Sequence, residues 1–219
     1  MQFRRPFFLL NSKLIDECET GRSVLVVLSR RFMQIECMRA EEHIYGEHSS
    51  PADETTILGI DPGLNNTGYG IVSVTHDEVE LVEAGVIKTN PRDELSSRLN
   101  EIYCGLAGVI REFKPELMAV EDLYSHYGHP KTAIIMGHAR AMVFLQSAQS
   151  GVPIETYAAT KVKSALTGNG RASKEQMQLM VKSRLGLSAV PRPADAADAL
   201  AVALCHWHVH HQLQKASMF

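Results

Sequence analysis

The sequence of 219 residues predicts an α/β fold with a mixed five-stranded sheet flanked by helices. Two short apolar runs, residues 57–60 and 117–120, have the length and composition of buried central strands. Segment 78–89 alternates apolar and polar residues as an antiparallel strand does. Segment 95–113 repeats apolar residues at helical spacing. Three antiparallel strands followed by helix–strand units produce a sheet of this kind.

The boundaries of these elements are set by local start and stop signals. The turn Pro62-Gly63 closes the first strand, and Lys114-Pro115 ends the helix before the strand at 117–121. The remaining predicted elements are a strand at 68–75 paired with 78–89, a helix at about 131–149, a strand at 153–157, a basic helical region at 161–184 and a helix that starts at Pro193.

Four acidic residues are placed so that their carboxylates can meet. Asp61 and Glu121 end the two apolar strands, and strand ends of this kind project at the carboxyl edge of a sheet, where α/β proteins place their sites. Asp195 and Asp198 are three residues apart at a helix start, so both lie on one face of its first turn. Each residue alone has a simpler reading as a turn, a helix cap or a solvated strand end. The ordered set favours a shared site.

Carboxylates that converge repel one another unless a cation lies between them. A hard divalent cation such as Mg²⁺, or Mn²⁺ in its place, binds oxygen ligands of this type. Two such ions about 4 Å apart stabilise both the attacking water and the leaving oxygen when a phosphodiester is cut. The sequence therefore predicts a site for two ions and phosphodiester chemistry.

The ordered motifs resemble the RuvC family of bacterial Holliday junction resolvases over about residues 56–213. The matching stretches are Ile57–Gly63, Thr67–Gly70, Ala119–Glu121, Tyr157–Ala159, Lys161–Lys163 and Ala194–Leu200. The resemblance implies a ribonuclease H-like fold and an endonuclease that nicks two opposed strands of a four-way junction symmetrically in DNA recombination and repair. It also implies catalytic and metal-binding roles for Asp61, Glu121, Asp195 and Asp198, although some members carry His where Asp195 stands.

The same resemblance suggests further site residues and partners. Lys163 and Lys174 match family lysines near the scissile phosphate, where they would stabilise charge in the transition state. Tyr124 falls where the family often has Phe and would stack on an unpaired base. Family members act as dimers and work with the RuvA and RuvB branch-migration complex.

The net charge of −3 hides a basic strip at residues 161–184, which hold six basic residues and a single acidic one, Glu175. Such a strip can neutralise phosphates, and a solvated helix surface is the alternative. The predicted DNA contacts from this strip, besides the two lysines above, are Lys161, Arg171, Lys182 and Arg184.

The helix at 131–149 is apolar nearly all round, which predicts burial on two sides and therefore a partner subunit. A two-fold homodimer would present two active sites in symmetric register.

Residues 1–55 precede the family resemblance and carry no motif, so they are expected to be an N-terminal extension or the result of an upstream start site, with Met33 or Met38 as other initiators. The expected nuclease domain is 56–213, followed by a tail at 214–219. No apolar stretch is long enough for a membrane span, and four cysteines without C-x-x-C spacing indicate reduced thiols in the cytoplasm.

Two other function classes stay open at this point. One is a junction-binding protein without cleavage, which would not need all four carboxylates. The other is a fragment of an actin-like ATPase, which would need a second domain and a second Gly-rich phosphate loop. A zinc site at His206 and His210 is a further alternative to histidines that interact with the helix dipole.

Overall fold

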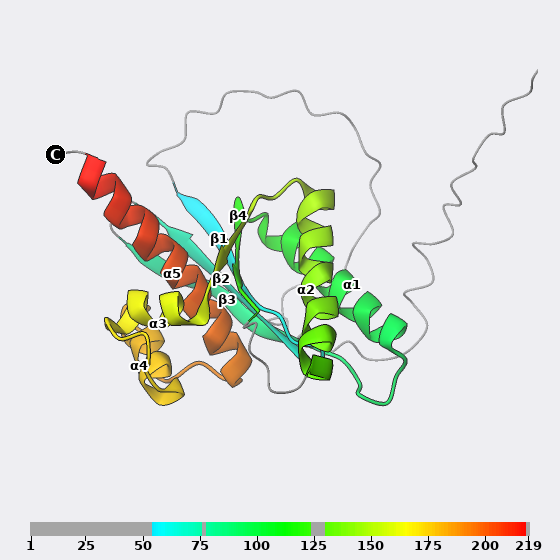
Figure 1. Cartoon of the computed structure of the whole chain (residues 1–219). Coiled ribbons are helices and arrows are strands. Elements are labelled where there is room, and N and C mark those ends of the chain that lie inside the picture. The colour runs from blue at the N-terminus through cyan, green and yellow to red at the C-terminus, as the bar shows by residue number, and fades with distance from the viewer. Residues whose placement is uncertain (1–53, 76–77, 124–129, 218–219) are drawn as a thin grey trace, which may run out of the picture.

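The computed structural model describes residues 54–75, 78–123 and 130–217. Its elements in chain order are β1 (Thr55–Asp61), β2 (Asn66–Val74), β3 (Val79–Lys88), α1 (Leu95–Phe113), β4 (Leu117–Glu121), α2 (Pro130–Ser150), β5 (Ile154–Tyr157), α3 (Ala159–Thr167), α4 (Lys174–Arg184) and α5 (Ala194–Ser217). Figure 1 shows them as one sheet with helices on either side. No helix within these ranges is both long and apolar enough to cross a membrane.

The five strands form one mixed sheet in the order β3-β2-β1-β4-β5. Strands β1, β2 and β3 pair antiparallel, whereas β4 lies parallel to β1 and β5 parallel to β4. The predicted mixed five-stranded sheet is therefore confirmed. Because β1 and β4 are parallel neighbours at its centre, their carboxyl ends lie side by side at one edge.

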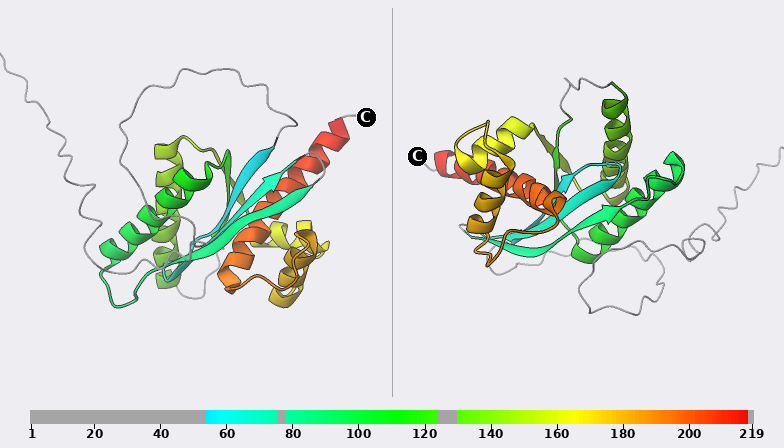
Figure 2. Two further views of the ribbon diagram at one scale, coloured as in Figure 1. Left: turned by 180° about the vertical axis from the view of Figure 1, so that it is seen from behind. Right: turned by 90° about the horizontal axis from the view of Figure 1, so that it is seen from below.

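Helices cover both faces of the sheet, and successive strand residues bury into opposite layers. Ile57 packs in the layer that contains Leu200 and the neighbouring residues of α5, together with residues of α3 and α4. Leu58 packs in the other layer, against Ile102 of α1 and Val143 of α2. Figure 2 shows α1 and α2 on one side of the sheet and α3, α4 and α5 on the other.

Glycines on β1 and β2 allow α5 to lie unusually close to the sheet. A Cβ atom at Gly59 would lie 2.1 Å from the carbonyl oxygen of Ala199, and one at Gly68 would lie 2.1 Å from that of Asp195. Larger residues would therefore push the helix outward. Since Gly68 is the register partner of Asp61, this close contact brings the first turn of α5 to the end of β1.

The basic helical region predicted at 161–184 consists of two helices, α3 and α4. Gly168 ends α3 with φ 73°, and Ser173 begins α4 with a capping box to Gln176. Lys114 ends α1 in the left-handed region with φ 46°, which agrees with the predicted stop.

The predicted division into an extension, a nuclease domain and a tail stays a prediction. Residues 1–53 and Tyr124 lie outside the described residues, and α5 continues as far as Ser217.

Candidate active site

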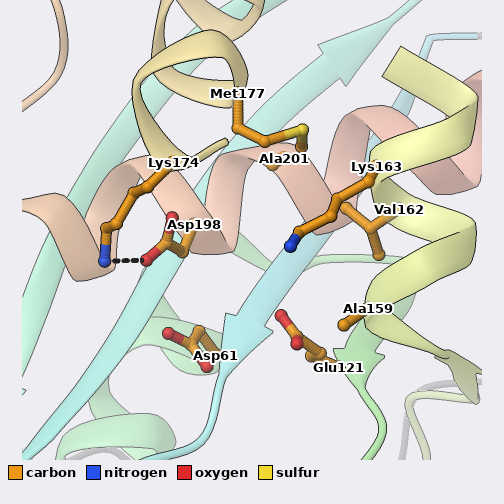
Figure 3. A pocket seen from close by; sticks show the side chains of 9 residues that line it. All are labelled: Asp61, Glu121, Ala159, Val162, Lys163, Lys174, Met177, Asp198 and Ala201. Atoms are coloured by element: carbon orange, nitrogen blue, oxygen red, sulfur yellow. Dashed lines mark ion pairs between the residues drawn. The ribbon is translucent and has the colours of Figure 1, made fainter. Parts of the chain in front are cut away.

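Carboxylates from three separate elements line one pocket. Asp61 is the last residue of β1 and Glu121 the last residue of β4, so both leave the sheet at its carboxyl edge. Asp198 projects from the beginning of α5, which packs on these strands. The pocket has a volume of about 270 Å³, and Figure 3 shows Lys163 of α3 and Lys174 of α4 on its other sides. The predicted meeting of strand-end and helix-start carboxylates is therefore observed for these three.

Asp195 is half-buried in the first turn of α5 and does not line the pocket. Its negative charge nevertheless contributes to raising the pKa of Asp61. The structure thus brings three of the four predicted carboxylates to the pocket wall and keeps the fourth close enough to act on Asp61 through its charge.

The carboxylates of the site are not fully neutralised by its two lysines. Burial, followed by the charges of Glu121, Asp198 and Asp195, raises the pKa of Asp61 to about 7 against an opposing effect of Lys174. Burial and the charge of Asp198 likewise raise the pKa of Glu121 above its usual range. Desolvation and like charges disfavour the ionised form of a carboxyl group, so a cation bound here would relieve both groups.

The two lysines have different partners. Lys174 Nζ lies 2.8 Å from Asp198 Oδ2, and this hydrogen bond raises the pKa of the lysine. The ammonium group of Lys163 points into the space between the carboxylates in Figure 3, and its charge opposes the rise in the pKa of Glu121.

A metal site is only partly formed in this arrangement. Within residues 54–75, 78–123 and 130–217, no three His, Cys, Asp or Glu side chains stand where they would hold an ion together without moving. Asp198 is held instead by Lys174. The acidic groups of the pocket are all carboxylates on neighbouring elements, which suits a hard cation such as Mg²⁺ better than zinc.

Comparison with known proteins identifies the family. The family model described as crossover junction endodeoxyribonuclease RuvC matches residues 57–206. The chain belongs to the RuvC family. A RuvC from Rhodopirellula baltica is 50% identical over 167 residues, which are 76% of this chain and 94% of that protein.

Solved RuvC structures resemble the chain over most of the described region. The Thermus thermophilus RuvC structure has a TM-score of 0.67 and 35% identity, and it covers 72% of this chain and 96% of its own. The structure of T. thermophilus RuvC in complex with Holliday junction substrate has a TM-score of 0.66 and 34% identity with the same coverage. The predicted family and the ribonuclease H-like fold are confirmed, and this member of the family belongs among the endodeoxyribonucleases.

The other predicted basic contacts lie away from the pocket of this RuvC family member. Lys161 and Arg184 lie near the later part of α5, where burial and, after it, the charges of these two residues lower the pKa of His208. Lys161 and Lys163 are two residues apart, and a helix turns about 200° over two residues, so their side chains diverge. Arg171 is exposed between α3 and α4, and Lys182 is half-buried in the last turn of α4.

The histidines of α5 make internal contacts. Nδ1 of His206 lies 2.7 Å from the hydroxyl oxygen of Tyr157, and its ring stacks on His210 with 4.2 Å between centroids. Burial and the neighbouring His210 lower the pKa of His206 to about 4. At neutral pH His206 is therefore an uncharged group that joins α5 to β5.

Two polar arrangements beside the site were not predicted from the sequence. Arg98 of α1 donates to the carbonyl oxygen of Leu64 and to the side chain of Asn65, in the loop that follows Asp61. Arg140 of α2 pairs with Asp122 at 2.6 Å. The sequence does contain one sign of the first arrangement, because Arg98 lies on the helix face that otherwise carries apolar residues. Its partners Leu64 and Asn65, however, lie more than thirty residues away in the sequence.

Proposed function

We propose that this chain resolves Holliday junctions by metal-dependent hydrolysis and nicks two opposed strands symmetrically in DNA recombination and repair. The observation that carries the proposal is the pocket in which Asp61, Glu121 and Asp198 meet two lysines, in a member of the crossover junction endodeoxyribonuclease family. The structure of the T. thermophilus relative with a Holliday junction substrate supports the choice of DNA.

Asp61, Glu121 and Asp198 are the proposed ligands of two Mg²⁺ ions, for which Mn²⁺ can substitute, and Asp195 is the fourth. The uncompensated negative charge at Asp61 fits such a role. When bound, the ions would stabilise the attacking water and the leaving oxygen. The protein contributes a partly buried pocket in which these charges act strongly, because little water screens them.

The basic residues divide by position. Lys163 and Lys174 border the pocket, and we assign to them the neutralisation of charge on the reacting phosphate. Lys161, Arg171, Lys182 and Arg184 are proposed to hold the DNA backbone farther from the cut, and Tyr124 is proposed to stack on a base.

The outer face of α2 supports a homodimer. Its inner face buries Ala139, Val143 and Gln146. Its outer face exposes a stripe of residues that follow one another at intervals of four and three positions in turn. These residues are Ile134, His138, Ala141, Leu145 and Ala148. A stripe with this spacing is typical of a helix that packs against another helix. A second copy of α2 would cover it and pair two active sites about a two-fold axis.

The family resemblance alone adds RuvA and RuvB as partners, whereas the proposed location in the cytoplasm rests on four cysteines without C-x-x-C spacing. Co-sedimentation with purified RuvA and RuvB on junction DNA tests the first expectation.

Cleavage of a synthetic four-way junction tests the function. Wild-type protein should cut it with Mg²⁺ and not after chelation, and Asp61→Asn should bind the junction without cutting. Glu80→Gln, on the exposed part of β3, is the matched control and should cut normally. If wild-type protein binds but does not cut, the chain is a junction-binding protein. Cutting by Asp61→Asn at the wild-type rate would refute the site.

A further inference from the structure

The loop between Asp61 and β2 is fixed by two residues from elsewhere in the chain. Thr89 donates its hydroxyl to the carbonyl oxygen of Leu64 at 2.6 Å and its backbone N–H to that of Asn65 at 3.0 Å. Arg98 Nη2 donates to the same oxygen of Leu64 at 3.2 Å, and Arg98 Nε donates to Thr89 Oγ1 at 2.9 Å. The loop directly after a proposed ligand is therefore held at several points.

Arg98 also fixes the orientation of the Asn65 amide. The arginine is 9% exposed, and no carboxylate in the described part of the chain pairs with it. Its Nη2 donates to Asn65 Oδ1. A guanidinium group has only donors, so the amide oxygen must face it and the amide NH₂ must face away. Asn65 itself is exposed, so this NH₂ is presented at the surface.

We propose that Asn65 binds the substrate, by donating its oriented NH₂ group to a phosphate oxygen of the DNA strand that enters the pocket. The inference rests on the proposed function. Asn65 is four positions after Asp61, so their Cα atoms lie within about 14 Å of each other. Lys88, exposed and in register with Asn66 beside the loop, adds a positive charge that favours an anion. Arg98 is a positioning residue in this arrangement, since it acts through Asn65.

An amide that is already oriented binds without losing rotational freedom, so its contact is strong for a neutral group. Loss of one hydrogen bond to a charged phosphate should weaken junction binding about tenfold. Because the amide carries no charge, that loss should leave the salt dependence of binding unchanged.

The test compares substitutions at Asn65 with the same substitutions at its exposed neighbour Asn66, whereas the side chain of Arg98 donates to Thr89, Leu64 and Asn65. Junction affinity is measured in Ca²⁺ over a range of salt, beside thermal stability and single-turnover cleavage in Mg²⁺. Asn65→Ala should bind about tenfold more weakly with an unchanged salt slope. Asn65→Asp should fold at least as stably, since the new carboxylate pairs with Arg98, but should bind more weakly still, because it lacks the donor and repels phosphate.

Asn66→Ala and Asn66→Asp should bind the junction with an affinity within about twofold of wild type. The negative charge added in Asn66→Asp has only a small long-range effect. If wild-type protein cuts junctions and the Asn65 variants match the Asn66 variants in affinity, the inference is wrong and the proposed function stands. If the wild type neither binds nor cuts, both fail.

Discussion

Asp61 has the most unfavourable environment for a charged group among the site carboxylates, and this has a consequence for stability. Its pKa is about 7 in the folded protein, against an ordinary value of 3.8. Between these two pH values the unfolded chain has lost the proton that the folded chain retains. Stability therefore falls as the pH rises through this window, and the full cost is present above pH 7.

Asp61→Asn should for this reason stabilise the protein in a chelator at pH 8, with a gain that shrinks toward pH 4. Because part of the carboxylate still contacts water, we expect a gain of about 1–2 kcal/mol, or a rise in Tm of about 2–6 °C. Thermal unfolding at both pH values measures this. A lower Tm for the variant at pH 8 would contradict the charge balance described above.

Mg²⁺ at pH 8 should make the wild type more stable than Asp61→Asn. A ligand that binds only the folded state raises Tm with its concentration, so Mg²⁺ should stabilise the wild type and have much less effect on Asp61→Asn. The same titration without DNA reports on the ions separately from cleavage. Equal rises in Tm for the two proteins would show that the ions bind away from Asp61.

Substitution of the two pocket lysines should lower the cleavage rate without weakening junction binding. Lys163→Ala and Lys174→Ala should lower the single-turnover rate at saturating enzyme at least about tenfold, with little change in junction affinity. Arg171→Ala, on the exposed loop between α3 and α4, should instead weaken binding and reduce the salt slope by about one. Full cutting rates for both lysine variants at saturation would make them binding residues.

At the scale of elements, α2 exposes the apolar stripe that the proposed dimer would bury. Leu145→Glu should yield a folded monomer, because Leu145 is 41% exposed in the single chain and its replacement need not disturb the core. Leu179→Glu on α4, at a leucine that is 58% exposed, is the matched control and should remain dimeric. Sedimentation at micromolar concentration measures both. A wild type that sediments as a monomer would contradict the dimer.

Most elements could be predicted because their signals are local. The strands that end at Asp61 and Glu121 are short apolar runs, and α1 was predicted from its helical periodicity and from the stop signal Lys114-Pro115. The basic region at 161–184 was predicted only as helical, and the structure divides it into α3 and α4 at Gly168 and Ser173. The Arg98 contacts were not predictable in the same way, since they join segments far apart in the sequence through hydrogen bonds that no local pattern records.

For the whole molecule, the helices that line the pocket, α3, α4 and α5, lie on one side of the sheet, and α2 lies on the other. A two-fold dimer through α2 would thus leave both pockets open to DNA. Because the two active sites of such a dimer are related by the two-fold axis, they would cut two opposed strands of one four-way junction as a pair.

A plasmid that extrudes a four-way junction as a cruciform tests this central claim most directly. Two symmetric nicks made within one binding event convert the supercoiled circle to a linear molecule, whereas a single nick gives only an open circle. We expect wild-type protein with Mg²⁺ to produce linear DNA, and Asp61→Asn to leave the supercoiled circle intact. Open circles alone from the wild type, or linear product from Asp61→Asn, would contradict the account.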